Sequence, residues 1–117
     1  MNARAIYDHT IEHGGGTFTS SGEVFAADSG YMVGGGIPTI TVPEDDIVAL
    51  AEGLRTMIER LPDGHFVGTW VHEGEIYIDA SAHHEVLELA VEVAQQHEEL
   101  AIFDLSTLTD IAITLDN

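Results

Sequence analysis

The residues best suited to metal chemistry are two histidines, His9 and His13, which stand four positions apart and would share one face of a helix. That spacing can chelate zinc or nickel. The zincin pattern also needs a glutamate directly after the first histidine, and Thr10 occupies that position. Third ligands from residues 72–73 or 83–85 are an alternative. We expect a pair of surface histidines and no metal site.

Other catalytic patterns are absent from the sequence. The chain has no cysteine, no Gly-x-Ser-x-Gly elbow, and serines only in turn contexts. The glycine triplets at 14–16 and 34–36 are not followed by the lysine of a phosphate-binding loop. Paired carboxylates are too abundant to single out any one pair. We therefore predict no catalytic residues, no enzymatic activity and no cofactor.

Negative charge dominates the composition. Asp and Glu number 21 against three arginines and no lysine, which gives a formal net charge of −18. Such a chain repels nucleic acid and anionic membranes, because it lacks the cations that replace phosphate counterions. Three explanations for the acidity remain: solubility or adaptation to a salt-rich cytoplasm, a surface for a basic partner, or binding of divalent cations.

Size and hydrophobicity predict a single acidic α+β domain over residues 1–117. Hydrophobic residues make up 44% of the chain, which is enough for a core. The absence of cysteine favours a reducing compartment. The first residues, with Asp8 and Glu12 close behind, do not resemble a signal peptide, and no apolar run reaches the length of a membrane span. We expect a soluble protein of the host-cell cytoplasm.

The predicted third helix, residues 82–99 with Ser81 as its cap, carries the clearest charge pattern. Four acids fall within about 60° of one another at 100° per residue: Glu85, Glu88, Glu92 and Glu99. The opposite side of this helix is apolar and consists of Val86, Leu87, Ala90, Val93 and Ala94. Along the axis the acids are spaced by roughly 4.5, 6 and 10.5 Å, which is comparable to the phosphate spacing of a DNA strand.

The predicted second helix, about 18 residues from Pro43, repeats this theme. Asp45, Glu52 and Glu59 recur every seven residues on the side away from its apolar stripe, with Arg55 and Arg60 as the nearby cations. Unrelieved like charges are unfavourable on an ordinary solvated helix. We therefore predict that these two acidic rows bind a partner as a DNA mimic, and the alternative is a plain solvated face.

The remaining elements complete an αββ-αββ-αββ order, with three helices packed on one face of a mostly antiparallel sheet. A first helix is predicted over residues 3–13, and Gly14 ends it. Residues 17–20 and 31–33 are predicted to form one hairpin, and 66–71 and 76–79 a second that turns at residues 73–74. Residues 100–105 and 111–115 are the predicted closing strands. Trp70 is expected in the core.

Part of the second half resembles known proteins. The segments concerned are Gly68–Val71, Ile76–Asp79 and Glu99–Leu105, separated by the acidic helix. In style the chain is similar to small accessory proteins of actinobacterial phages. Over residues 66–105 it resembles the antirestriction proteins of conjugative plasmids and transposons. These are acidic DNA mimics, often dimeric, that occupy restriction enzymes, and the chain differs from them in length and in lacking their additional acidic modules.

Charge pattern and resemblance together predict an inhibitor from a phage or mobile element. Its expected partner is a host DNA-binding or DNA-processing protein, with no direct nucleic-acid or membrane contact, and homodimerisation is one possible arrangement. Two other readings remain: an acidic α+β module that binds a metal or small ligand through its histidines, and a housekeeping protein of a halophile.

Overall fold

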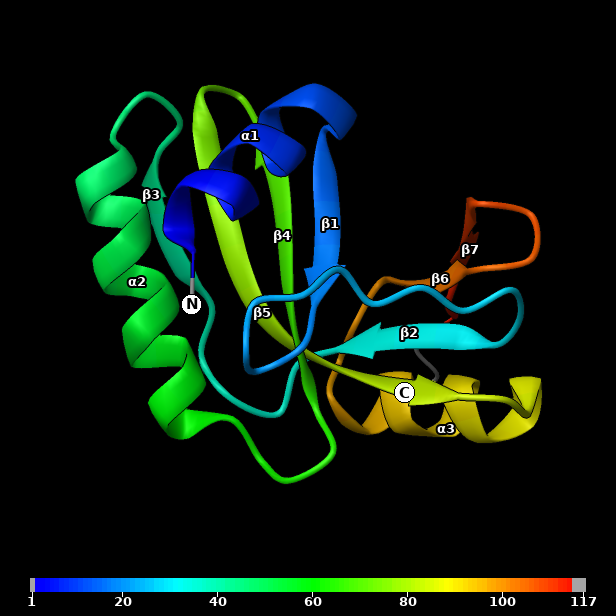
Figure 1. The fold of residues 1–117 in the computed structure, drawn as a ribbon. Helices are drawn as coiled ribbons and strands as arrows, with labels where there is room; N and C mark the ends of the chain where they lie inside the picture. Colours follow the sequence, from blue (N-terminus) through cyan, green and yellow to red (C-terminus); the bar gives the residue numbers. More distant parts are fainter. Residues whose placement is uncertain (1, 115–117) are drawn as a thin grey trace. The chain divides into compact units, whose positions relative to one another are not determined.

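The computed structural model describes residues 2–114, and the chain forms two compact units (Figure 1). Unit 1 comprises Met1–Phe25 and Ile37–Ala80, and unit 2 comprises Ala26–Gly36 and Ser81–Asn117. The α+β class is confirmed, with three helices and seven strands in the described residues and mostly antiparallel strand pairs. The order of elements is αβββαββαββ, so it departs from the predicted repeat by one additional strand.

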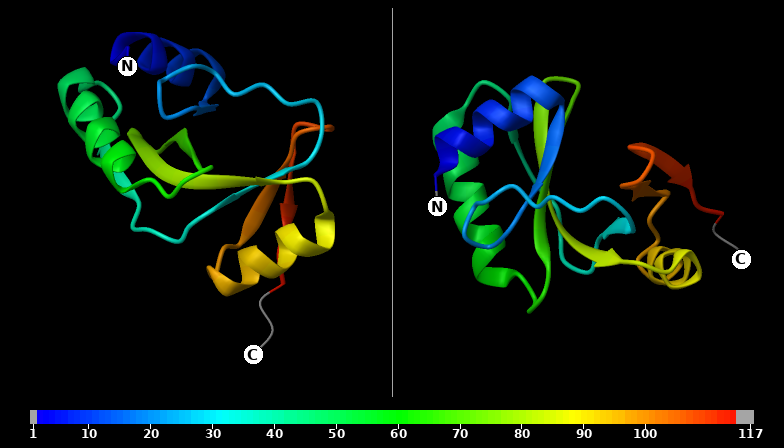
Figure 2. Two further views of the ribbon diagram at one scale, coloured as in Figure 1. Left: turned by 60° about the horizontal axis from the view of Figure 1, so that its bottom comes forward. Right: turned by 45° about the vertical axis from the view of Figure 1, so that its right-hand side comes forward.

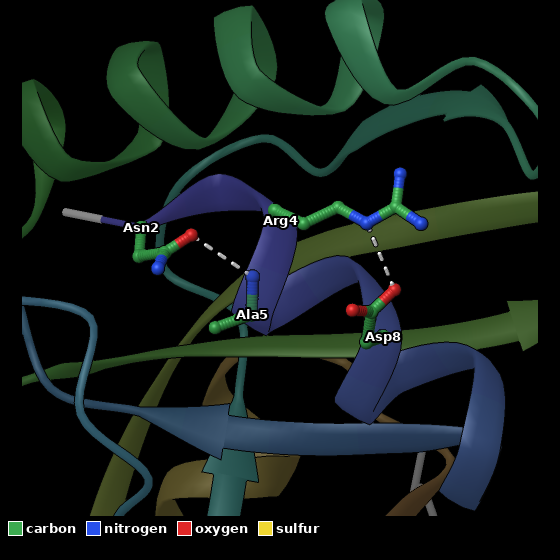
Figure 3. A network of polar contacts seen from close by, with 4 residues as sticks. All are labelled: Asn2, Arg4, Ala5 and Asp8. Carbon is green, nitrogen blue, oxygen red and sulfur yellow. Dashed lines mark hydrogen bonds and ion pairs between the residues drawn. The ribbon is translucent and has the colours of Figure 1, made fainter.

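The first helix of unit 1, α1 (Ala3–His13), agrees with the prediction. Asn2 caps its start, because the Asn2 Oδ1 atom accepts a hydrogen bond of 3.1 Å from the Ala5 amide (Figure 3). Arg4 and Asp8 form an ion pair of 3.2 Å one turn apart on the exposed side (Figure 3). Gly14 ends the helix with a left-handed φ of 78°. Local chemistry therefore determines where this helix begins and ends.

The second helix, α2 (Ile47–Arg60), begins later than predicted. Asp46 is its N-cap, and its Oδ1 atom accepts from the Ala49 amide at 2.9 Å. Pro43 instead ends a strand, β3 (Ile40–Pro43), which pairs with the first residues of β5 (Glu75–His84). The error has a physical cause: proline is as acceptable at the end of an edge strand as in the first turn of a helix.

The sheet of unit 1 consists of β1 (Gly15–Phe18), β4 (Phe66–His72), the first part of β5, and β3. The predicted hairpin between β4 and β5 is confirmed, and its turn residues Glu73 and Gly74 both have positive φ. α1 lies over β1 and β4, and α2 lies beside β3 and β4 (Figure 1). The core between these helices and strands contains Ile6, Phe18, Val42, Leu50, Leu54, Met57, Val67, Ile76, Ile78 and Ala80.

The predicted hairpin between residues 17–20 and 31–33 is wrong. β1 pairs with β4, whereas β2 (Tyr31–Gly34) pairs with the end of β5 and with β6 (Ala101–Asp104). The turn after β1 leads only to a single bridge between Phe18 and Val24. Strands that follow one another in sequence often pair, but here β1 and β2 each pair with strands from the second half of the chain.

Unit 2 contains β2, the last four residues of β5, β6, β7 (Thr109–Ala112) and the helix α3 (Leu87–Gln96). β6 and β7 pair as an antiparallel hairpin where two closing strands were predicted. β7 begins and ends earlier than the predicted range 111–115: Ile113 and Thr114 follow the strand, and Leu115 lies outside the described residues. α3 packs against β2 and β6 (Figure 2). The core of unit 2 consists of Val33, Ala90, Ala94, Ile102 and Ile113.

α3 is shorter than the predicted helix over residues 82–99. Ser81, the predicted cap, is buried in β5 opposite Gly34, and the strand continues to His84. Val86 occupies the N-cap position without a side-chain cap. The helix ends before Glu98, which has a positive φ of 58°. Pairing with β2 therefore overrides the helical pattern of residues 82–84.

None of the described helices has the length and apolar character that crossing a bilayer requires.

Candidate interaction surfaces

Only two of the four acids in the predicted row lie on α3. Glu88 and Glu92 lie on this helix and are exposed, one turn apart, while Ala90 and Ala94 are buried. Glu85 is exposed but precedes the helix, and Glu99 follows it. Glu99 is half-buried, and its Oε1 atom lies 2.6 Å from the position that a Cβ on Gly35 would take. The prediction that all four acids form one row on a helix is therefore wrong.

The apolar residues at the start of α3 also differ from expectation. Val86 and Leu87 were predicted to belong to the apolar side of the helix, opposite the acids, but they are 48% and 39% exposed. Leu89 is 52% exposed. Ala90 and Ala94 are fully buried, and Val91 and Val93 pack against the core of unit 2 as partly buried side chains. The helix begins after Val86, so Val86 takes no part in this packing. The exposed surface mixes acids and aliphatic groups, and we call it the α3 ridge: Glu85, Val86, Leu87, Glu88, Leu89 and Glu92.

Unit 2 contains no cationic side chain of lysine or arginine. The chain has no lysine, and all three arginines, Arg4, Arg55 and Arg60, belong to unit 1. In the described part of the chain, the acids of the α3 ridge take part in no ion pair. Further acids in the sequence of unit 2 add to the negative charge: Asp28, Glu98, Glu99, Asp104, Asp110 and Asp116. Unit 2 therefore has a negative formal charge and no lysine or arginine to offset its carboxylates.

Asp104 has a structural role in this unit. Its carboxylate accepts hydrogen bonds from the Ser106 hydroxyl at 2.7 Å and from the Ser106 amide at 2.9 Å. Hydrogen bonding by the Ser106 hydroxyl lowers the pKa of Asp104 from its usual value. Asp104 thereby stabilises the turn between β6 and β7, and we do not assign it to the ridge.

The predicted acidic row of the second helix lies in unit 1. Glu52 and Glu59 are exposed on α2, two turns apart and away from the buried Leu50 and Leu54. Asp45 is exposed but precedes the helix and its cap, so the row is helical only at its last two members. Among the described residues, Glu52 and Glu59 form no ion pair with the neighbouring arginines. Each row is an acidic surface of its own unit.

The histidine pair on α1 has mutual and apolar contacts. The rings of His9 and His13 lie 4.4 Å apart, and His9 packs edge-on against Phe18 at 5.4 Å. Within residues 2–114, no group of three or more His, Cys, Asp or Glu is arranged to hold a metal ion. In unit 2, the His83 Nε2 atom lies 2.9 Å from the Ser29 carbonyl oxygen, a hydrogen bond that anchors the loop before β2.

Trp70 was predicted to be a core residue, and this was wrong, because it is 44% exposed. Its indole contacts the rings of Tyr77 at 4.9 Å and His72 at 5.1 Å. Strand alternation contained the signal: Val67 and Thr69 are buried under the helices, so Trp70 must face the other way. In the described part of unit 1, no helix covers that other face.

Comparison of the chain with protein-family models, with curated proteins and with solved structures gives no match.

Proposed function

We propose that this chain is a non-enzymatic inhibitor that binds a DNA-processing protein by occupying its DNA-binding surface. The observation that carries the proposal is the α3 ridge in a unit that has no lysine or arginine. Glu85, Glu88 and Glu92 would meet the cationic groups that otherwise contact DNA phosphates. The proposed class is that of anti-restriction or anti-defence proteins of phages and mobile elements, and binding needs no cofactor.

The aliphatic part of the α3 ridge supports binding to a protein. Val86, Leu87 and Leu89 are exposed and adjacent in sequence to the acids, and apolar area within an interface gives affinity that charge alone does not. Burying three such side chains can contribute a few kcal/mol, from about 25 cal/mol per Å² of apolar area. The acids would steer the encounter and set its salt dependence. Asp45, Glu52 and Glu59 form a separate acidic surface of unit 1, which would bind cationic groups of such a partner in the same way.

Competition with DNA tests the proposal. Purified restriction endonucleases of several types would be assayed for cleavage of duplex DNA in the presence of the chain. We expect inhibition that added duplex DNA relieves and that weakens steeply between about 0.05 and 0.2 M salt. A matched protein of similar acidity and unrelated fold is the control for charge alone. Inhibition that DNA does not relieve, or binding that is insensitive to salt, would contradict the proposal.

A further inference from the structure

Three aromatic side chains gather on the side of the unit 1 sheet that α1 and α2 leave uncovered. We call this cluster, Trp70, His72 and Tyr77, the aromatic face. The Trp70 and Tyr77 rings meet at 65° with centroids 4.9 Å apart, and His72 lies 5.1 Å from Trp70 and 6.2 Å from Tyr77. Trp70 is 44% exposed although it is the largest side chain of the molecule. An exposed aromatic cluster on a strand pair is typical of a recognition site.

The neighbouring strand β1 does not cover the aromatic face beside Trp70. Gly15 in β1 pairs with Trp70, and the absence of a side chain there leaves the flank of the indole uncovered. A Cβ on Gly15 would lie 2.6 Å from the Thr69 carbonyl oxygen and 3.2 Å from the Trp70 Cβ atom. At the other end of the face, Phe25 stacks on Phe66 at 4.1 Å. The exposed aromatic face is therefore confined to the end of the sheet near the turn between β4 and β5.

Acidic groups border the aromatic face, and arginines do not. Glu73 and Glu75 are exposed at the hairpin, and the Glu73 side chain is 84% exposed. The three arginines of the chain lie on α1 and α2, which cover the opposite side of the sheet. The one cation–π contact recorded for the described residues places Arg4 over Tyr7, within α1. The His72 Nε2 atom lies 3.8 Å from the Glu73 Oε1 atom, and that contact is an ion pair only when His72 is protonated. No lysine or arginine of the described residues forms an ion pair with Glu73 or Glu75.

We propose that the aromatic face binds arginine side chains of a basic protein segment. A guanidinium can stack on the indole of Trp70 or the ring of Tyr77 while its N–H groups donate to Glu73 or Glu75. Arginine is favoured over lysine because its planar group stacks and donates at the same time. Stacking of nucleic-acid bases is disfavoured by the charge of the chain, since phosphates would approach a net −18.

This site is independent of the α3 ridge. It consists entirely of unit 1 residues, so it can exist whether or not the ridge in unit 2 binds a DNA-processing protein. Loss of binding at one surface can also be measured while the other is intact.

The test uses the only tryptophan of the chain, because Trp70 fluorescence reports directly on the aromatic face. The full chain is titrated with capped hexa-arginine, hexa-lysine and hexa-citrulline peptides in about 0.1 M salt. We expect a saturable change in fluorescence that is several-fold tighter for hexa-arginine than for hexa-lysine and undetectable for hexa-citrulline. The lysine peptide has the same charge, so the ratio of the two affinities separates stacking from general attraction to an acidic protein.

Variants locate the site. Tyr77→Leu should weaken hexa-arginine binding about three- to fivefold, the fold-change expected for one cation–π contact at an exposed position. It should also bring the arginine-to-lysine ratio close to one, while Tyr77→Phe keeps the ring and the ratio. Glu75→Gln should weaken both cationic peptides more than Asp63→Asn, which removes the same charge from an exposed loop. His72→Ala is a second probe if Tyr77→Leu loses its folded circular dichroism signal.

Three results would overturn the proposal. Equal affinities for the arginine and lysine peptides would show attraction by charge alone. Binding of the citrulline peptide as tightly as the arginine peptide would show that a cation is not required. A concentration-dependent dimer that buries Trp70 and excludes the peptides would assign the face to a second copy of the chain.

Discussion

The hydrogen bond between Thr10 and Thr69 offers a sharp test of how α1 is held on its sheet. Their hydroxyl oxygens lie 2.7 Å apart, and the two residues are 0% and 4% exposed. Valine has nearly the shape of threonine but no hydroxyl. Thr10→Val would leave the Thr69 hydroxyl buried without this partner, and Thr69→Val would do the same to Thr10. An unsatisfied buried hydroxyl costs about 1–3 kcal/mol.

The double variant distinguishes the hydrogen bond from packing. With both hydroxyls replaced, no unsatisfied polar group remains from the pair and additional apolar surface is buried, so Thr10→Val/Thr69→Val should be close to wild type. The two single changes should each lower the free energy of unfolding by about 1–3 kcal/mol, so the coupling energy between them should be about the sum of the two single losses. Urea denaturation followed by circular dichroism measures all four proteins. Additive losses, or single variants as stable as wild type, would refute the reasoning.

Three further predictions concern charge and ligands. Burial raises the pKa of Asp79, opposed by the hydrogen bond from Thr39, so the folded state disfavours its carboxylate. In urea denaturation at pH 7, Asp79→Asn should therefore have a higher free energy of unfolding than wild type. This difference should disappear as the pH falls below 3.8, the ordinary pKa of the carboxyl group. A difference that persists at pH 3 would exclude titration of Asp79 as its cause. We expect calorimetry with zinc or nickel to show no saturable site of micromolar affinity. A saturable site that the His13→Ala variant loses would contradict this expectation. Thermal unfolding should be cooperative in about 0.1 M salt, whereas a requirement for molar salt would support adaptation to a saline cytoplasm.

The sequence predicted those elements whose ends are determined locally. α1 follows directly from an asparagine cap and a left-handed glycine, and the β4–β5 hairpin from its Glu73-Gly74 turn. In each case the controlling contacts lie within a few residues of one another. The apolar residues of α2 were also predictable, because helical spacing places them on one face. The buried residues of that face include Leu50, Leu54 and Met57.

Elements that depend on distant strands were not predictable in this way. Ser81–His84 has a helical pattern but pairs with β2, and residues 40–43 pair with the start of β5. As a result, α3 begins at Leu87, two members of its acidic row lie outside it, and Val86 becomes exposed. For Trp70 two signals in the sequence disagree: the alternation with Val67 and Thr69 predicts exposure, and the hydrophobicity of the indole predicts burial. The alternation is the one that agrees with the structure.

The double variant Glu88→Lys/Glu92→Lys is suited to testing the acidic surface, because its effect on the fold should be small. Both side chains are exposed, and the buried Ala90 and Ala94 are unchanged. Lysine is a good helix former. Glu88 lies in the first turn of α3, so its reversal replaces a favourable dipole interaction of about 0.3–1 kcal/mol with an unfavourable one of similar size. Circular dichroism and urea denaturation should show a folded protein that is less stable by no more than about 2 kcal/mol.

The central claim is that the α3 ridge binds a DNA-processing protein, and the most direct measurement is the affinity of the double variant for an enzyme that the wild type inhibits. We predict that Glu88→Lys/Glu92→Lys abolishes binding, since like charges brought together at an interface cost several kcal/mol. The matched control, Glu12→Lys/Asp63→Lys, makes the same change in net charge at exposed positions of unit 1 and should bind within a few-fold of wild type. A folded double variant that binds as tightly as wild type would contradict the account.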